Sequence, residues 1–244
     1  MFGRKFLIFI FFSTFLFGQK NVENQQLLWY GYYNKLQINQ NWVLNSEVQE
    51  RHFYQPLVQH QLVFRTNLDR RILDDINVSL GFVVFLQSPN DPESESTLMV
   101  PELRTDFGFN AKKKYKYFNA NQRFKVEARF FHQTENNELV GGYQFSNFRM
   151  RYQLGLDIPL IKKQDAEKLI LKIKDEVMFN FGKNIVKNVF DQNRIYISLN
   201  YPMNKNLAFE AGYLNWFQQR PSGTDFYNRD IIRFSVFHTI NLKK

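Results

Sequence analysis

Apolar and polar residues alternate along most of this chain, in segments of about ten residues. Between Ile195 and Tyr201, every second residue is Ile, Leu or Tyr, and the residues between them are Tyr, Ser and Asn. Successive side chains of a β-strand point to opposite faces, so this alternation is typical of strands and not of helices. The pattern therefore predicts an all-β chain whose strands each have two different faces.

The alternation predicts eleven strands that are separated by turn-forming residues. Compact connectors such as 39–41 and 202–205 alternate with longer polar ones such as 87–97 and 218–229, as in outer-membrane barrels, which have short periplasmic turns and longer external loops. An antiparallel barrel needs an even strand count, so either a short strand lies in 19–26 or one segment is split or merged. We expect a single antiparallel transmembrane β-barrel of about 10–12 strands. The predicted strands are 27–37, 42–51, 58–68, 76–86, 100–110, 122–133, 145–157, 169–181, 190–201, 206–217 and 230–242.

The two faces of the predicted strands differ in charge. An Arg or Lys that faces lipid near the bilayer midplane costs roughly 2–4 kcal/mol, so the charged face must point into the barrel. The apolar face, predicted to meet lipid, includes Trp42, Leu44, Val48, Leu62, Phe64, Leu68, Phe124, Val126, Phe130, Phe148, Met150, Tyr152, Leu154, Leu156, Ile232, Phe234, Val236 and Ile240. The charged face, predicted to line the lumen, includes Glu47, Arg65, Arg104, Asp106, Arg123, Glu127, Arg129, Arg149, Arg151, Lys172, Lys174, Arg194, Glu210 and Arg233, with Arg51, Glu102, Asp157 and Glu176.

Asp175 does not fit this division, because it shares the apolar phase of its segment. A β-bulge at this point would turn its side chain inward, and we expect one there. Aromatic residues that the pattern places near strand ends are predicted to form interfacial girdles. These residues are Trp42, Tyr201, Tyr213 and Phe217.

The charged face supports two interpretations of the interior. Arg and Glu side chains that alternate across neighbouring strands can pair into ladders and fill a small barrel, which favours a structural or accessory subunit. The interior is also basic on balance, which is compatible with a narrow, anion-preferring pore. The pattern does not choose between the filled interior and the pore.

Residues 1–18 have the pattern of a secretory signal peptide. Arg4 and Lys5 supply its positive start, an apolar stretch follows, and Gly18 is suited to cleavage before Gln19. A membrane anchor is the alternative, but the apolar stretch is short for a span of about 20 residues. The barrel is then 19–244, in the outer membrane of a Gram-negative bacterium. Its expected partners are outer-membrane lipid, the outer-membrane assembly machinery and, for an accessory subunit, another outer-membrane protein.

Composition narrows the class of protein further. Aromatic residues make up 17% of the chain, which a soluble β-sandwich could also explain. A packed sandwich core would not tolerate the many unpaired charges of the second face, so we favour the membrane barrel. The net charge of +9 is spread singly over the strands and not clustered, which disfavours nucleic-acid binding. The absence of Cys excludes disulfides, thiolate metal sites and a cysteine-linked lipid anchor.

The sequence contains no convincing catalytic constellation, and we expect a non-enzymatic protein without cofactor or metal. A lipid hydrolase of the barrel wall is the less favoured alternative, and it needs Ser and His on one face within hydrogen-bond reach. Ser235 and His238 have opposite parity, while His132 could meet Ser146 of a neighbouring strand but lacks a third group. The acidic residues of the loop 87–97 could at most bind calcium loosely.

Several segments resemble the outer-membrane barrel family known as domain of unknown function 2490. The resemblance is carried by 190–196, by 204–207 and by Glu210-Ala211-Gly212-Tyr213-Leu214-Asn215, and the earlier hairpins 29–35 and 42–51 are similar too. It implies a barrel with its termini near the periplasm and no established activity. The matching positions are Asp191, Arg194, Glu210, Gly212 and Tyr213. Since Arg194 and Glu210 point inward on adjacent predicted strands, we expect an ion pair between them.

Overall fold

The computed structural model describes residues 20–164 and 166–242. The predicted leader 1–18 and its cleavage site lie outside the described residues. No helix in the described ranges is long and apolar enough to cross a membrane. The strands are β1 (Asn21–Gln37), β2 (Trp42–Phe53), β3 (Gln59–Leu73), β4 (Ile76–Gln87), β5 (Val100–Lys114), β6 (Asn119–Glu135), β7 (Glu138–Lys163), β8 (Ala166–Phe181), β9 (Phe190–Pro202), β10 (Leu207–Gln219) and β11 (Asp225–Asn241).

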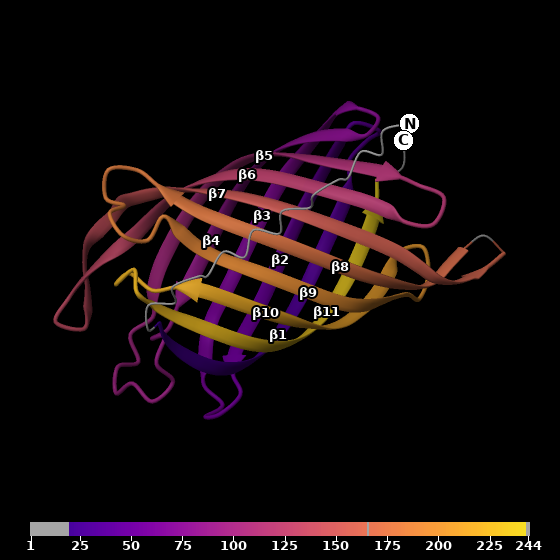
Figure 1. Ribbon diagram of the computed structural model, residues 1–244. Helices are drawn as coiled ribbons and strands as arrows, with labels where there is room; N and C mark the ends of the chain where they lie inside the picture. The colour runs from indigo at the N-terminus through magenta and orange to yellow at the C-terminus, as the bar shows by residue number, and fades with distance from the viewer. Residues whose placement is uncertain (1–19, 165, 243–244) are drawn as a thin grey trace, which may run out of the picture.

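The strands form one closed barrel in chain order, as Figure 1 shows. The prediction of an all-β barrel with eleven strand segments is confirmed. The expectation of an even, fully antiparallel set is wrong, because β1 and β11 pair in parallel, from Asn21 opposite Asp225 to Gln37 opposite Asn241. An odd number of up-and-down strands brings the first and last together in the same direction, and parallel pairing then satisfies both of their edges. Residues 21–26 are the start of β1 and not a separate strand.

The connections differ between the two ends of the barrel (Figure 1). We call one end the loop end; its connections are 54–58, 88–99, 136–137, 182–189 and 220–224. The opposite end, with the connections 38–41, 74–75, 115–118 and 203–206, is the turn end. Because β1 runs parallel to β11, Asn21 lies at the loop end and Asn241 at the turn end. The two ends of the described chain therefore lie at opposite ends of the barrel, contrary to what the family resemblance implies.

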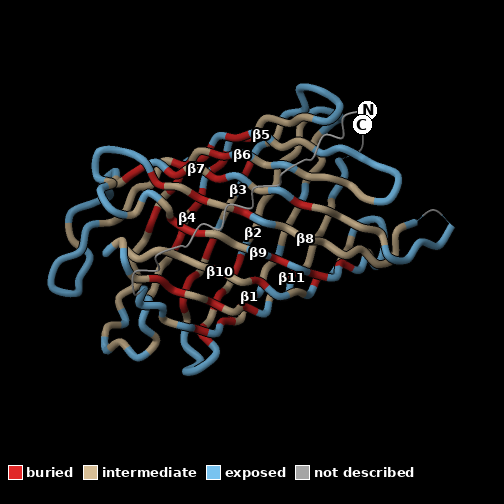
Figure 2. The backbone as a smooth tube through the Cα atoms, viewed as in Figure 1, coloured by how far each residue is buried: buried red, intermediate tan, exposed pale blue. Residues whose placement is uncertain are grey.

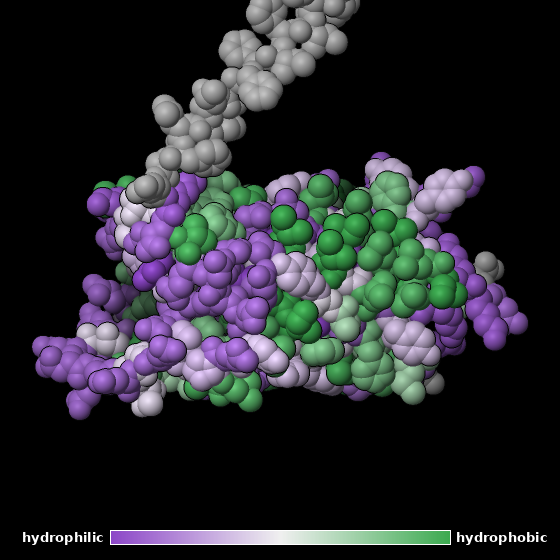
Figure 3. Space-filling view, turned by 60° about the horizontal axis from the view of Figure 1, so that its bottom comes forward, coloured by the Kyte–Doolittle hydropathy of each residue, from purple (hydrophilic) through white to green (hydrophobic). Residues whose placement is uncertain are grey.

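The wall separates an apolar outer surface from a polar interior. Leu154, Ile197 and Phe234 point outward and are 44%, 46% and 46% exposed. Buried positions alternate with them along the strands and gather in the half nearer the loop end (Figure 2). On the face that Figure 3 shows, apolar side chains gather toward one end of the barrel and polar ones toward the other. The alternation in the sequence is thus the alternation between outside and inside.

The parallel seam can be tested by a disulfide cross-link, because the chain has no native Cys. Tyr32 of β1 lies opposite Val236 of β11, and directly opposed strand residues are close enough for a disulfide. We expect Tyr32→Cys with Val236→Cys to cross-link nearly completely under mild oxidation, as measured by a mobility shift on gels. Leu28→Cys with Val236→Cys is the control and should stay reduced, since Leu28 lies opposite Ile232. Efficient cross-linking of the control pair alone would contradict the register.

Candidate functional site

The interior side chains of β5 to β9 form a continuous network of ion pairs, which we call the charged ladder. Glu127 of β6 lies at its centre and accepts from Arg149 at 2.5 Å and from Arg151 at 2.6 Å, both on β7. Glu176 of β8 accepts from Arg151 at 2.9 Å and from Arg123 at 2.8 Å. Arg151 of β7 thus bridges carboxylates on β6 and β8, so the ladder links neighbouring strands of the wall.

The ladder continues toward the loop end on both sides of its centre. Glu102 of β5 accepts from Arg104 and from Arg129, both at 2.6 Å. Asp191 of β9 accepts from Arg149 at 3.0 Å. The full membership is Glu102, Arg104, Arg123, Glu127, Arg129, Arg149, Arg151, Glu176 and Asp191.

Water has little access to the centre of the ladder. The side chains of Glu127, Arg149, Arg151 and Glu176 are 1%, 4%, 7% and 6% exposed. Charges buried to this degree are tolerated only when they are paired and hydrogen-bonded, because their desolvation cost is large. The geometry meets this condition, since Arg149 and Arg151 each donate hydrogen bonds to two carboxylates.

The other side of the interior is filled by apolar and aromatic side chains. The ring centroids of Trp29 on β1 and Trp216 on β10 are 5.8 Å apart in an edge-on arrangement. We call the group around them the aromatic cluster. Its members are Leu27, Trp29, Phe53, Tyr196, Leu214, Trp216 and Ile231. An apolar cluster inside the barrel was not expected from the sequence, which predicted a charged inner face.

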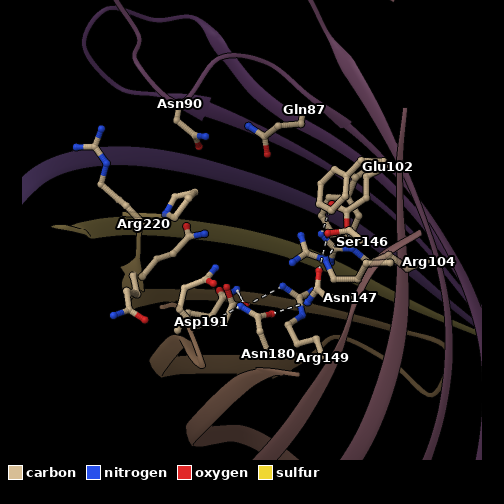
Figure 4. Close-up of a pocket in the computed structure, with 18 of the residues that line it drawn as sticks. Gln87, Asn90, Glu102, Arg104, Ser146, Asn147, Arg149, Asn180, Asp191 and Arg220 are labelled. Atoms are coloured by element: carbon tan, nitrogen blue, oxygen red, sulfur yellow. Dashed lines mark hydrogen bonds and ion pairs between the residues drawn. The ribbon is translucent and has the colours of Figure 1, made fainter. Parts of the chain in front are cut away.

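A cavity of about 640 Å³ lies at the loop end of the interior. Three loops contribute to its rim, through Asn90, Asn184 and Arg220 among others, and its wall includes members of the charged ladder and Trp216. Figure 4 shows Asn90 on one side of this space and Asp191 and Arg149 on the opposite side. A second cavity of about 380 Å³ lies at the turn end. We call the first the loop-end cavity. Arg65, which pairs with Glu47, lines both cavities.

The structure places all fourteen predicted lumen residues on the inner side of the wall, in several groups. Six belong to the charged ladder: Arg104, Arg123, Glu127, Arg129, Arg149 and Arg151. Glu47 pairs with Arg65, Asp106 with Lys125, and Lys172 with Glu210. Lys174, Arg194 and Arg233 have no ion pair with a described residue; Arg233 instead donates to the hydroxyl of Tyr33.

The expected ion pair between Arg194 and Glu210 is wrong. Arg194 lies opposite Trp216, whereas Glu210 lies opposite Asn200, so the register separates the two side chains along adjacent strands. Glu210 accepts from Lys172 at 2.8 Å instead. The sequence could give the parity of both residues, but only the strand pairing fixes which residues meet.

Two further expectations, for Asp175 and Tyr213 on the outer surface, are wrong. Asp175 is paired regularly with Leu154 and Ile195, without a bulge, and is exposed on the outside, where Asn193 donates to it at 2.6 Å. Tyr213 lies at the middle of β10 and not at a strand end, and its hydroxyl donates to Asp230. The outward-facing polar side chains around these contacts are called the outer polar stripe. Its members are Asp175, Asn193, Asn215, Asn228 and Asp230.

The remaining family-motif residue, Gly212, has a packing role. It faces inward on β10, and a Cβ added there would lie 2.5 Å from the carbonyl oxygen of Ile197 and 2.4 Å from Cβ of Ser198. Backbone cannot move aside as a flexible side-chain end can, so only glycine fits without displacement of β9.

Sequence reasoning missed Arg229, which is fully buried in the interior. It donates to Gln25 and Gln218 and stacks over Trp216. Its parity matches that of Arg233, four residues later, so extending the predicted last strand by one residue would have found it. Trp29 and Trp216 share the inward parity of their strands as well, but an apolar residue gives no signal that it faces a lumen.

The histidines considered for hydrolysis do not meet their serines. His132 contacts the backbone carbonyl oxygen of Gln133, while Ser146 donates to Asn147. His238 lies on the outer surface against the hydroxyl of Tyr32. Within the described ranges, no group of three or more His, Asp or Glu side chains could hold a metal ion.

Fold and interior together define an eleven-stranded closed β-barrel whose inner face carries paired charges and buried aromatics. The chain belongs to the family described as Protein of unknown function (DUF2490), whose model matches residues 26–228. Comparison with curated proteins finds no match, and comparison with solved structures finds none.

Proposed function

We propose that the protein is a non-enzymatic barrel of the outer membrane whose closed interior makes it a structural or accessory subunit. The burial of the charged ladder carries this proposal. A water-filled path through the middle would leave the side chains along it exposed, whereas Glu127 and Arg149 are 1% and 4% exposed. The aromatic cluster occupies the facing part of the interior.

The outer surface supports a membrane location. Large apolar side chains point outward on every strand from β1 to β11, among them Tyr30, Val48, Phe64, Leu80 and Phe107. Exposing so many of them to water would form an apolar patch far larger than soluble monomers carry, whereas lipid contact removes that cost. Outer-membrane lipid and the outer-membrane assembly machinery are then the partners that every such barrel requires.

Recording from planar lipid bilayers tests the closed interior. We expect the purified full-length protein to insert without any stepwise conductance, while a general porin added to the same bilayers gives clear steps. For an accessory subunit, we also expect a second outer-membrane protein to remain bound through purification in mild detergent. Regular conductance steps from the pure protein would refute the closed interior. Absence of both current and a bound partner would refute the accessory subunit and also a narrow pore.

A narrow, anion-preferring pore is the second candidate, and the basic wall of the loop-end cavity is the observation that favours it. In that case the two cavities would have to join past Arg65. Conductance would then favour anions and would fall when Arg149, Arg151 or Arg194 is replaced by Glu. The same bilayer recordings decide between the closed interior and the pore.

A further inference from the structure

The wall of the loop-end cavity carries more positive than negative charge. Nine Lys and Arg side chains and two carboxylates line it. Both carboxylates already accept hydrogen bonds from arginines: Glu102 from Arg104, and Asp191 from Arg149. Carboxylates behind the wall pair with several of the other cations. A surplus nevertheless remains at Arg51, Arg194 and Lys187, and of these Lys187 is exposed on a loop while the two arginines lie on strands.

Arg51 of β2 and Arg194 of β9 line the cavity without a carboxylate partner in the described structure. Arg51 is 3% exposed and donates to the side-chain oxygens of Gln49 at 2.8 Å and Gln61 at 2.5 Å. Arg194 donates from Nε to Gln192 at 2.9 Å, and its Nη1 and Nη2 form no hydrogen bond to a described residue. A guanidinium withdrawn from water without a counter-charge is costly, so the burial of Arg51 favours an added anion. Arg194 is only partly buried, and its two unbonded nitrogens can donate to the same anion.

Both guanidinium groups stack on the tryptophan pair. The Cζ atom of Arg51 lies 3.8 Å from the ring centroid of Trp29. The Cζ atom of Arg194 lies 4.4 Å from the centroid of Trp216 and 5.6 Å from that of Trp29. Stacking fixes the plane of a guanidinium. Arg194 keeps Nη1 and Nη2 free to donate, whereas Arg51 already donates from Nε, Nη1 and Nη2 to its two glutamine partners and keeps one further N–H on each Nη. Both arginines therefore have fixed orientations beside the same tryptophan pair, at the boundary between the aromatic cluster and the cavity.

We propose that the loop-end cavity binds a small organic anion, whose carboxylate or phosphate group is held by Arg51 and Arg194. The planar N–H edge of Arg matches both oxyanions. Trp216 and Phe85, which are 3% and 4% exposed, line the same space and would lie beside the apolar part of the ligand. The volume of about 640 Å³ lies within the range of small-molecule sites. The site needs no conduction through the barrel, so it goes beyond the function proposed above.

Calorimetric titration of the purified full-length barrel tests the site. The probes are phenyl phosphate and benzoate, with inorganic phosphate and benzyl alcohol as references that lack the ring or the charge. We expect saturable binding of at least one aromatic anion, at least about tenfold tighter than either reference. The stronger of the two aromatic anions identifies phosphate or carboxylate as the preferred group.

Matched variants distinguish anion binding at this site from general attraction of anions by the basic lumen. Arg194→Gln should weaken binding about tenfold or more, as expected for the loss of a charge-assisted hydrogen-bond donor. Arg233→Gln removes a lumen arginine that does not line the cavity and that also has no carboxylate partner. The affinity of this variant for the anion should stay within about twofold of the wild-type affinity.

Folding of each variant is checked by its heat-dependent gel mobility, and Arg194→Lys replaces Arg194→Gln if the latter does not fold. The lysine keeps the charge and loses the planar edge, so binding should still weaken severalfold. The proposal is overturned if the folded wild-type barrel binds neither aromatic anion saturably. It is also overturned if Arg233→Gln weakens binding as much as the change at Arg194.

Discussion

Glu127→Gln is expected to lower the free energy of unfolding by about 3–5 kcal/mol, the usual cost of leaving buried charges without their partner. Glu127 accepts from Arg149 and Arg151, and all three side chains are 7% exposed or less. The amide keeps the size of the side chain but provides no counter-charge for the arginines. Urea titration of the refolded barrel in lipid vesicles measures the change.

The surface pair between Arg220 and Glu23 supplies the control. These side chains are 33% and 42% exposed, at 3.3 Å, so Glu23→Gln should change stability by less than about 1 kcal/mol. Combining Glu127→Gln with Arg149→Met should cost less than the sum of the two single changes, because the charge stranded by the first change is removed by the second. Equal effects of Glu127→Gln and Glu23→Gln would show that the ladder is not sequestered from water.

Ile197→Arg is expected to destabilise the barrel in a bilayer by about 2–4 kcal/mol, the cost of an arginine that faces lipid near the midplane. Ile197 points outward on β9 between Ile173 of β8 and Tyr213 of β10, and it is 46% exposed. The loss should appear as a lower folded fraction in vesicles at a given urea concentration. This result would support lipid contact by the outer wall.

Asn193→Arg is the matched control, four residues earlier on the same strand and the same face. Asn193 belongs to the outer polar stripe and donates to Asp175, whose carboxylate can pair with an arginine. The free energy of unfolding of the Asn193→Arg variant should therefore differ from that of the wild type by less than about 1 kcal/mol. If Ile197→Arg is as mild as Asn193→Arg, the wall at Ile197 does not face lipid.

Much of the wall could be predicted from the chain alone. Parity along a strand is a local property, because each side chain alternates with its neighbour whatever the strand pairs with. The period of two therefore predicted Glu127, Arg149 and Glu210 on one face and Ile232 and Phe234 on the other, and the structure has them on opposite sides of the wall. The same signal placed Asp175 on the outer face, where the structure has it, and only the expected bulge that would have turned its charge inward is wrong.

The pairing of these residues could not be predicted in the same way. Register is the choice of which residues lie opposite each other on neighbouring strands, and a shift by two residues changes these partners while every side chain keeps its face. Glu210 thus lies opposite Asn200 and not Arg194, and it accepts from Lys172 of β8 across β9. The parallel closure of β1 on β11 is likewise a property of the whole ring, since only the total number of strands decides how the last meets the first.

The sequence by itself determined the all-β class, about eleven strand segments and the inner face of the predicted lumen charges, because these follow from local alternation and from the cost of charge in lipid. Only the tertiary structure decided which charges pair, where Trp29 and Trp216 meet, and that Arg51 and Arg194 are left without carboxylates beside a cavity. Those features arise between strands that are distant in the chain, and closure of the barrel is what brings them together.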